Sequence, residues 1–322
     1  MWTERHGSQK FGRLPHKLRL KLDHFRQQNP ILESESAAIE AFHGDVSDGL
    51  RQLLLDSGSG SEMISLLWFK LCLKHLDSVN RAFIKLVEEI DYPMGKWEAA
   101  VVHEYLYYSS NLLNRLNLIS SWISHLGSAR LSLSHALSLV ASSKSMAIEK
   151  LKPIYPKNQR DYGPKAQRDF GDRKEEDSEQ SISHGKGEVI LGAIMIMKAV
   201  TSSICGTLLF GLTRDAEPHF DLEKSTAGFL DSWIVYFDLR IREEFIKRGS
   251  VLKEVKEVND AVDNLVAASD HGDISNEIAE METKLKELQH LLEGVEEGVN
   301  GLFLEILGRR DELLDCLRPQ NQ

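Results

Sequence analysis

The chain has 322 residues, of which 42% are hydrophobic and 27% are charged, a composition typical of globular proteins and not of disordered ones. Its formal net charge of −10 disfavours a nucleic-acid-binding protein of the usual basic kind. Leucine, glutamate, lysine and alanine are abundant and prolines number only eight, which predicts helix nearly everywhere and no strand. The predicted fold is all-α, a long-helix antiparallel bundle with a coiled-coil-like C-terminal helix.

The N-terminal residues 1–30 are predicted to form a basic arm. The first 26 positions contain seven lysines and arginines against two acids, and within residues 12–25 one helical face carries Leu14, Leu18, Leu22 and Phe25. A local alternation of leucines also fits a short strand. We expect Lys17, Arg19 and Lys21 to contact an acidic surface, either the acidic C-terminal helix of this chain or anionic lipid. A solvated helix face is the simpler alternative.

Two helical halves are predicted to follow the arm. Residues 31–152 form the N-terminal half, and residues 187–318 form a C-terminal half that packs on it as one domain. Gly127 is expected to kink the chain between the last two helices of the first half. That half contains four predicted helices, at 37–55, 62–90, 96–126 and 128–151.

Residues 153–186 separate the two halves. This stretch has almost no aliphatic side chains and carries three prolines among mixed charges, which predicts a disordered loop. Three serines beside acidic residues are candidates for phosphorylation: Ser178, Ser181 and Ser183. An ordinary polar loop is the favoured interpretation, and the sequence leaves their modification open.

An apolar run from Val189 to Leu212 begins the second half and carries a single charge, Lys198, near its middle. As a helix the run would be about 36 Å long, which is enough to cross a bilayer. A thin stripe of polar and small residues around Lys198 indicates a helix that is packed on most sides. A buried core helix is therefore favoured, and a membrane segment is the alternative that the sequence leaves open.

The last predicted helix has the most regular pattern in the chain. Between residues 278 and 306 apolar positions alternate in steps of three and four, as in a coiled-coil seam. Val295 and Val299 of this seam are candidate interaction residues. Pairing within the chain is favoured, and a homo-oligomer formed through residues 278–306 is the alternative. Three glycines on a second stripe predict the close approach of another helix: Gly294, Gly298 and Gly301.

No motif in the sequence specifies a reaction. Residues 44–49 (GDVSDG) have the spacing of a phosphate-binding loop but lack its lysine and hydroxyl residue, so we interpret them as a helix interruption. The histidines never reach a metal-ligand spacing. His75 and His125 lie in apolar helical stretches and are expected to be hydrogen-bonded structural residues. We therefore expect no catalytic, cofactor or metal site.

The cysteines and the N-terminus bear on location. Cys72, Cys205 and Cys316 are widely spaced in helical apolar stretches, as expected of free thiols in a reducing compartment. The first thirty residues lack the apolar segment of a secretory signal and contain only Thr3 and Ser8 as hydroxyl residues, which also disfavours a transit peptide. A cytoplasmic location is predicted, with membrane association as the alternative.

Four stretches taken in order resemble the plant BYPASS-type protein family. They lie at 14–25 (LPHKLRLKLDHF), 64–87 (with Leu67-Trp68), 189–212 and 303–318 (with Gly308-Arg309-Arg310-Asp311). The resemblance implies a plant protein of development or stress signalling with no established catalytic activity. It also implies that residues 189–212 are a suspected membrane segment. Relatives have been tied to a root-derived mobile signal and to trafficking machinery.

Together these features predict a non-catalytic helical adaptor or regulator that binds a protein partner. A single-pass or peripheral membrane protein in vesicle traffic or mobile-signal control is the alternative. The sequence identifies neither the partner nor the pathway.

Overall fold

The computed structural model describes residues 31–56, 64–140, 142–155, 185–213, 232–248, 252–269 and 274–318. The basic arm at 1–30 and residues 156–184 of the predicted loop lie outside this part, so the predicted domain division stays a prediction. Every regular element in the described part is helical, which confirms the predicted all-α fold there. The first five are α2 (Ile31–Asp56), α3 (Leu66–Glu89), a 3₁₀ turn η1 (Met94–Lys96), α4 (Ala99–Ser138) and α5 (Lys144–Lys150). The others are α7 (Lys186–Thr213), α8 (Ser232–Arg248), α9 (Lys253–Ala268) and α10 (Ser275–Leu317).

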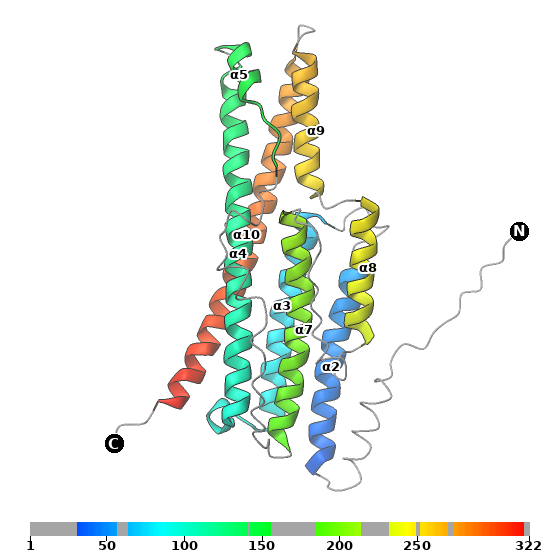
Figure 1. Cartoon of the computed structure of the whole chain (residues 1–322), viewed down its shortest axis with the longest axis vertical. Coiled ribbons are helices and arrows are strands. Elements are labelled where there is room, and N and C mark those ends of the chain that lie inside the picture. Colours follow the sequence, from blue (N-terminus) through cyan, green and yellow to red (C-terminus); the bar gives the residue numbers. More distant parts are fainter. Residues whose placement is uncertain are drawn as a thin grey trace, which may run out of the picture.

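Two long antiparallel helices, α4 and α10, run along most of the molecule and pack against each other (Figure 1). Beside their lower part lie α2, α3, α7 and α8, whereas α5 and α9 accompany their upper part (Figure 1). The predicted kink at Gly127 is wrong, because α4 continues through this residue to Ser138. A glycine in a helix interior costs only about 1 kcal/mol, which the packing of a 40-residue helix readily offsets.

Helix α7 is the central helix of the lower part. It contacts α2, α3, α4 and α8, which cover it from several directions. It is long and apolar enough to cross a membrane, but in the structure 61% of its most apolar window is buried against the rest of the chain. Packing of this kind is typical of a core helix. Length and composition alone would also fit a membrane span.

The seam of α10 is buried within the chain. Its apolar residues face α3, α4 and α9, as the step pattern of three and four requires. Val295 and Val299 are core residues there, in line with the favoured pairing within the chain, and their role as interaction residues stays a prediction. The chain's own helices therefore cover this seam. The buried seam consists of Met281, Leu285, Leu288, Leu292, Val295, Val299, Leu302 and Ile306.

The glycines of α10 meet α3 at two of the three expected positions. A Cβ on Gly294 would lie 3.2 Å from Lys70 Nζ, and one on Gly298 would lie 3.3 Å from Leu73 Cδ1. A Cβ on Gly301 would meet nothing within 4 Å. Close helix approach therefore explains the first two glycines and leaves Gly301 without a packing reason.

Candidate functional site

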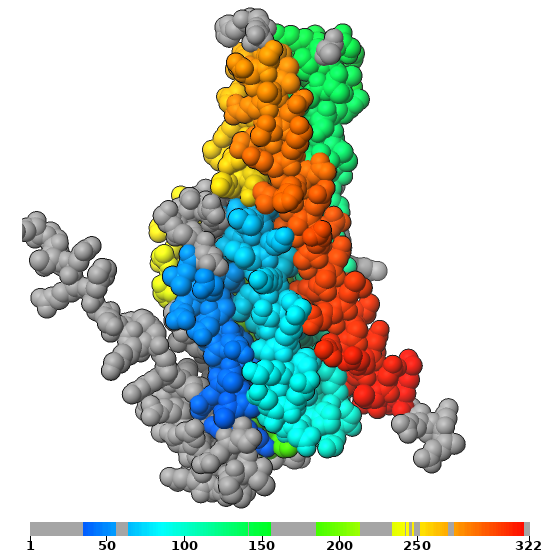
Figure 2. Space-filling model, turned by 180° about the vertical axis from the view of Figure 1, so that it is seen from behind, coloured from blue at the N-terminus to red at the C-terminus, as the bar shows by residue number. Residues whose placement is uncertain are grey.

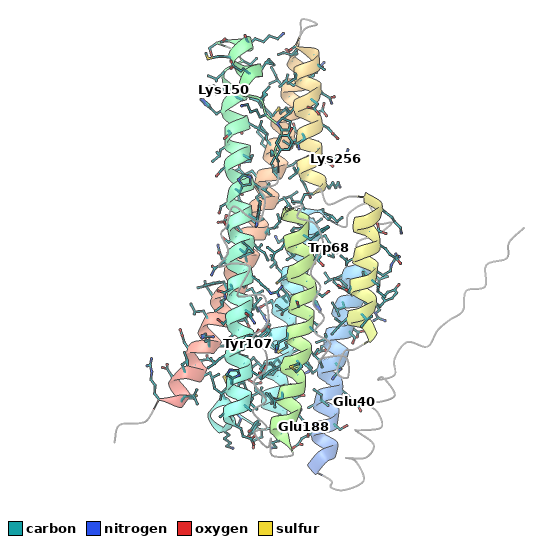
Figure 3. All side chains as sticks on the ribbon, in the orientation of Figure 1. Glu40, Trp68, Tyr107, Lys150, Glu188 and Lys256 are labelled. Carbon is teal, nitrogen blue, oxygen red and sulfur yellow. The ribbon has the colours of Figure 1, made fainter. Side chains whose placement is uncertain are left out.

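The charge in the middle of α7 is paired with α4. Lys198 Nζ lies 3.2 Å from Glu104 Oε2 and 5.0 Å from the ring centre of Tyr107, which Figure 3 labels on α4. The side chains of Lys198 and Glu104 are 21% and 31% exposed, so the pair lies at the edge of the core. An ion pair and a cation–π contact stabilise the ammonium there. The only charged side chain within the run from Val189 to Leu212 thus has partners inside the protein.

Next to this pair lies a buried hydroxyl network between α3 and α4. The Tyr108 hydroxyl donates to Asn80 Oδ1 at 2.9 Å, and Asn80 Nδ2 donates to the Leu76 carbonyl at 2.7 Å. Burial raises the pKa of Tyr108 well above its usual range and raises that of Tyr105 to about 12. Both phenols are therefore neutral at physiological pH, and a neutral, hydrogen-bonded phenol is suited to fixing the packing of two helices.

The polar stripe of α7 continues toward buried thiols. Arg115 Nη2 of α4 donates to Ser202 Oγ at 3.4 Å, and burial lowers the pKa of Arg115. Burial raises the pKa of Cys205 to about 11 and raises that of Cys72 well above its ordinary value. Thiols rather than thiolates occupy this part of the core, and a protonated buried thiol is a poor nucleophile.

One cavity of about 500 Å³ opens between α9 and α10. Three of its charged groups pair with each other: Lys284 Nζ lies 3.0 Å from Glu257 Oε2 and 3.1 Å from Glu287 Oε2. The Glu254 carboxylate beside them accepts from the Leu66 amide at the start of α3. Each of these three carboxylates thus has a structural partner already.

The C-terminal part of α10 is anchored to α4 by an arginine. Arg310 Nη1 donates to the Leu106 carbonyl at 2.9 Å and to Ser109 Oγ at 3.1 Å. Figure 2 shows α10 crossing one face of the molecule, with its last turns standing out from the body of the bundle. The anchor therefore fixes how this end of α10 projects.

Beside the anchor, α10 exposes a row of leucines, which we name the leucine ridge: Leu304, Leu307 and Leu314. Steps of three and seven residues place them on one helix face, and their exposed fractions are 67%, 36% and 36%. Glu312 and Asp315 lie beside this face and Asp311 lies on it between Leu307 and Leu314, while Arg309 pairs with Glu312 at 3.0 Å. The ridge is thus a set of exposed leucines on one helix face with acidic side chains on and beside that face.

The predicted site residues are not brought together in one place. Lys17, Arg19 and Lys21 lie outside the described residues, as do Ser178, Ser181 and Ser183. Val189 and Leu212 lie near the two ends of α7, with Lys198 between them. The leucine ridge was missed, although the spacing of leucines in FLEILGRRDELL shows it once the buried seam has been assigned.

The described residues offer no candidate metal site. These contain no group of three or more histidine, cysteine, aspartate or glutamate side chains that would hold a metal ion. The expectation of no metal and no cofactor for the whole chain stays a prediction.

Comparison with known proteins identifies one relative. The chain is 24% identical over 275 residues to "Protein BPS1, chloroplastic" of Arabidopsis thaliana, covering 80% of this chain and 78% of that protein. The chain is a distant relative of the BYPASS-related proteins. No family model matches the chain, and no solved structure matches it.

Three of the four stretches that carry the BYPASS resemblance lie in the described structure. They correspond to α3, α7 and the end of α10. Helix α3 packs against both α7 and α10. The helix of one resembling stretch thus contacts the two helices that carry the other two. The stretch at 14–25 lies outside the described residues.

The BYPASS-related protein of Arabidopsis also bears on location. Its name describes it as chloroplastic, which gives no support to the cytoplasmic location expected from the sequence. The residues that would decide on a transit peptide, 1–30, lie outside the described part.

Proposed function

We propose that this protein is a non-catalytic helical adaptor or regulator of plant development or stress signalling that acts by binding a protein partner. The observation that carries the proposal is the leucine ridge, a row of exposed leucines on a helix whose opposite face is fixed in the core. Isolated exposed leucines are ordinary, but a row of them at helical spacing is typical of a helix-binding surface. The similarity to a plant protein supports the plant setting.

The partner is inferred from the charge around the ridge. Acidic residues border the leucines, and Arg310 is directed inward to Leu106 and Ser109 rather than toward the ridge. A basic amphipathic helix fits both properties, since its apolar face covers the leucines and its lysines or arginines meet the carboxylates. We propose such a helix in a partner protein as the ligand of the ridge.

A fluorescent peptide of residues 12–26 (GRLPHKLRLKLDHFR) provides a probe of that chemistry. We expect the full-length protein to bind it saturably and the double variant L304D/L307D to bind at least tenfold more weakly, measured by fluorescence anisotropy. L131D is the matched control, because Leu131 is exposed on α4 away from the ridge. It should bind like wild type.

Two results would overturn this proposal. The first is the absence of saturable binding to any form of the protein. The second is binding only to the K17E/R19E/K21E variant, which would show that the chain's own basic segment fills the ridge. The double variant should keep the wild-type helical circular dichroism, because both leucines are exposed.

The membrane alternative rests on the length and composition of α7. Fractionation of tagged protein from plant cells, followed by alkaline carbonate extraction, tests it together with location. We expect carbonate to release the protein, because α7 is packed against four helices and its lysine is paired. Resistance to extraction would favour an inserted helix. Recovery in chloroplasts would replace the proposed cytoplasmic location.

A further inference from the structure

An extended segment follows α5 in the upper part of the molecule. Helix α5 ends at Lys150, because Pro153 lacks an amide hydrogen and forces the residue before it into an extended conformation. Residues 151–155 then run without regular secondary structure between α4 and α9 (Figure 1). Both of these helices pack against α10 beneath them.

One side chain of α9 hydrogen-bonds both the amide and the carbonyl of a residue in this segment. Asn259 Oδ1 accepts from the Ile154 amide at 2.7 Å, and Asn259 Nδ2 donates to the Ile154 carbonyl at 3.0 Å. A neighbouring β-strand offers a residue this same pair of hydrogen bonds. On the opposite side, His125 Nε2 of α4 lies 3.5 Å from the Tyr155 carbonyl oxygen. All three contacts are made to backbone amide or carbonyl groups, which every extended peptide possesses.

Two aliphatic side chains of the segment point into the protein. Leu151 and Ile154 are 5% and 3% exposed, whereas Lys152 and Tyr155 between and after them are exposed. The surface beneath it, bounded by Asn259 and His125, accepts two aliphatic groups three residues apart. We call this surface the 151–155 seat.

From this geometry we infer that the 151–155 seat is a peptide-binding site, which the chain's own residues 151–155 fill in the absence of a partner. The ligand is an extended segment of a partner protein with the pattern aliphatic, any residue, proline, aliphatic. Asn259 recognises its backbone, the two apolar positions give specificity, and the proline preorganises the extended conformation.

The seat is separate from the leucine ridge. It lies along the N-terminal part of α10, and the ridge lies at the other end of this helix (Figure 1). The inference therefore goes beyond the adaptor function proposed above and is tested independently of it. Because the chain's own segment is tethered, it competes at a high effective concentration, so a peptide in solution binds wild type only in the fraction whose seat is empty.

The experiment uses the fluorescent peptide acetyl-Leu-Lys-Pro-Ile-Tyr-amide and the full chain. The substitution I154D places a charge at the buried position and should eject the tethered segment. We expect this variant to bind the peptide at least tenfold more tightly than wild type does. The double variant I154D/N259L should lose that gain, because its leucine cannot hydrogen-bond the peptide backbone.

The control peptide carries aspartate in place of isoleucine and should not bind any form. A folded I154D variant without saturable binding, or equal binding by I154D and I154D/N259L, would overturn the inference. If I154D does not fold, hydrogen exchange on wild type decides instead. Excess peptide should speed the exchange of the Ile154 amide severalfold, and unchanged exchange would equally overturn the inference.

Discussion

Gly49 of α2 lies directly against the imidazole ring of His75 of α3, so close that any Cβ at position 49 would overlap the ring. Both residues come from stretches that the sequence suggested for other roles. The GDVSDG stretch was expected to interrupt a helix, but α2 runs without a break from Ile31 to Asp56. Gly49 therefore provides the space in which α3 and its histidine approach α2.

Replacing Gly49 with alanine should destabilise the protein by about 1–3 kcal/mol, since overlap in a packed interface outweighs the gain in helix propensity. Urea unfolding followed by circular dichroism measures the change. Gly44 of the same helix is the matched control, because a Cβ there would meet nothing within 4 Å. G44A should instead stabilise by about 0.5–1 kcal/mol. Equal effects of the two substitutions would contradict the assigned contact.

His75 itself should make stability depend on pH. Burial lowers its pKa from 6.5 to about 4, and Nε2 is buried with no hydrogen-bond partner among the described residues, contrary to the hydrogen-bonded role expected from the sequence. The unfolded chain therefore binds a proton at a higher pH than the native protein does. The stabilisation is complete above pH 6.5 and falls by about 3 kcal/mol as the pH decreases to 4.

The variant H75Q tests this dependence, since glutamine is of similar size and does not titrate. Its free energy of unfolding should change less than that of wild type between pH 7.5 and pH 4.5, measured with urea at each pH. The same slope in both proteins would assign the pH dependence to other groups.

The sequence predicts the buried faces of these helices well, because the spacing of apolar residues along a helix indicates which face is buried. The steps of three and four in α10 give its buried face, and the continuous apolar run of α7 gives a helix that is packed on most sides. Local patterns do not give helix boundaries or partners. The uninterrupted course of α4 through Gly127 depends on packing along its full length, which no short window contains.

The polar contacts were beyond sequence reasoning for a different reason. Asn259 and Ile154 are 105 residues apart, and Arg310 and Leu106 are 204 apart. Which polar side chain meets which backbone group depends on the helix arrangement, and a single sequence contains no measure of it. The leucine ridge is an intermediate case, since its spacing is local but its exposure depends on which face of α10 the bundle covers.

The pairing of Lys198 with Glu104 should contribute measurably to stability. A double-mutant cycle with K198M and E104Q isolates the pairwise term, and we expect a coupling free energy of about 1 kcal/mol for an ion pair that is mostly shielded from water. Urea unfolding of wild type, the two single variants and the double variant measures this coupling free energy. The exposed Lys256–Asp260 pair of α9, at 2.9 Å, is the control and should show a smaller coupling. Indistinguishable couplings would mean that burial does not strengthen the Lys198 pair.

The reactivity of the three cysteines tests the central position of α7. Cys205 of α7 and Cys72 of α3 are buried, and burial raises the pKa of each, whereas Cys316 near the end of α10 is exposed. Only the thiolate reacts, and only where the reagent reaches it. One thiol per chain should therefore react with a maleimide in the native protein, and all three should react in denaturant. The C316S variant is the control and should react only when denatured. Rapid labelling of Cys205 in native C316S would show that α7 is not enclosed by its neighbours.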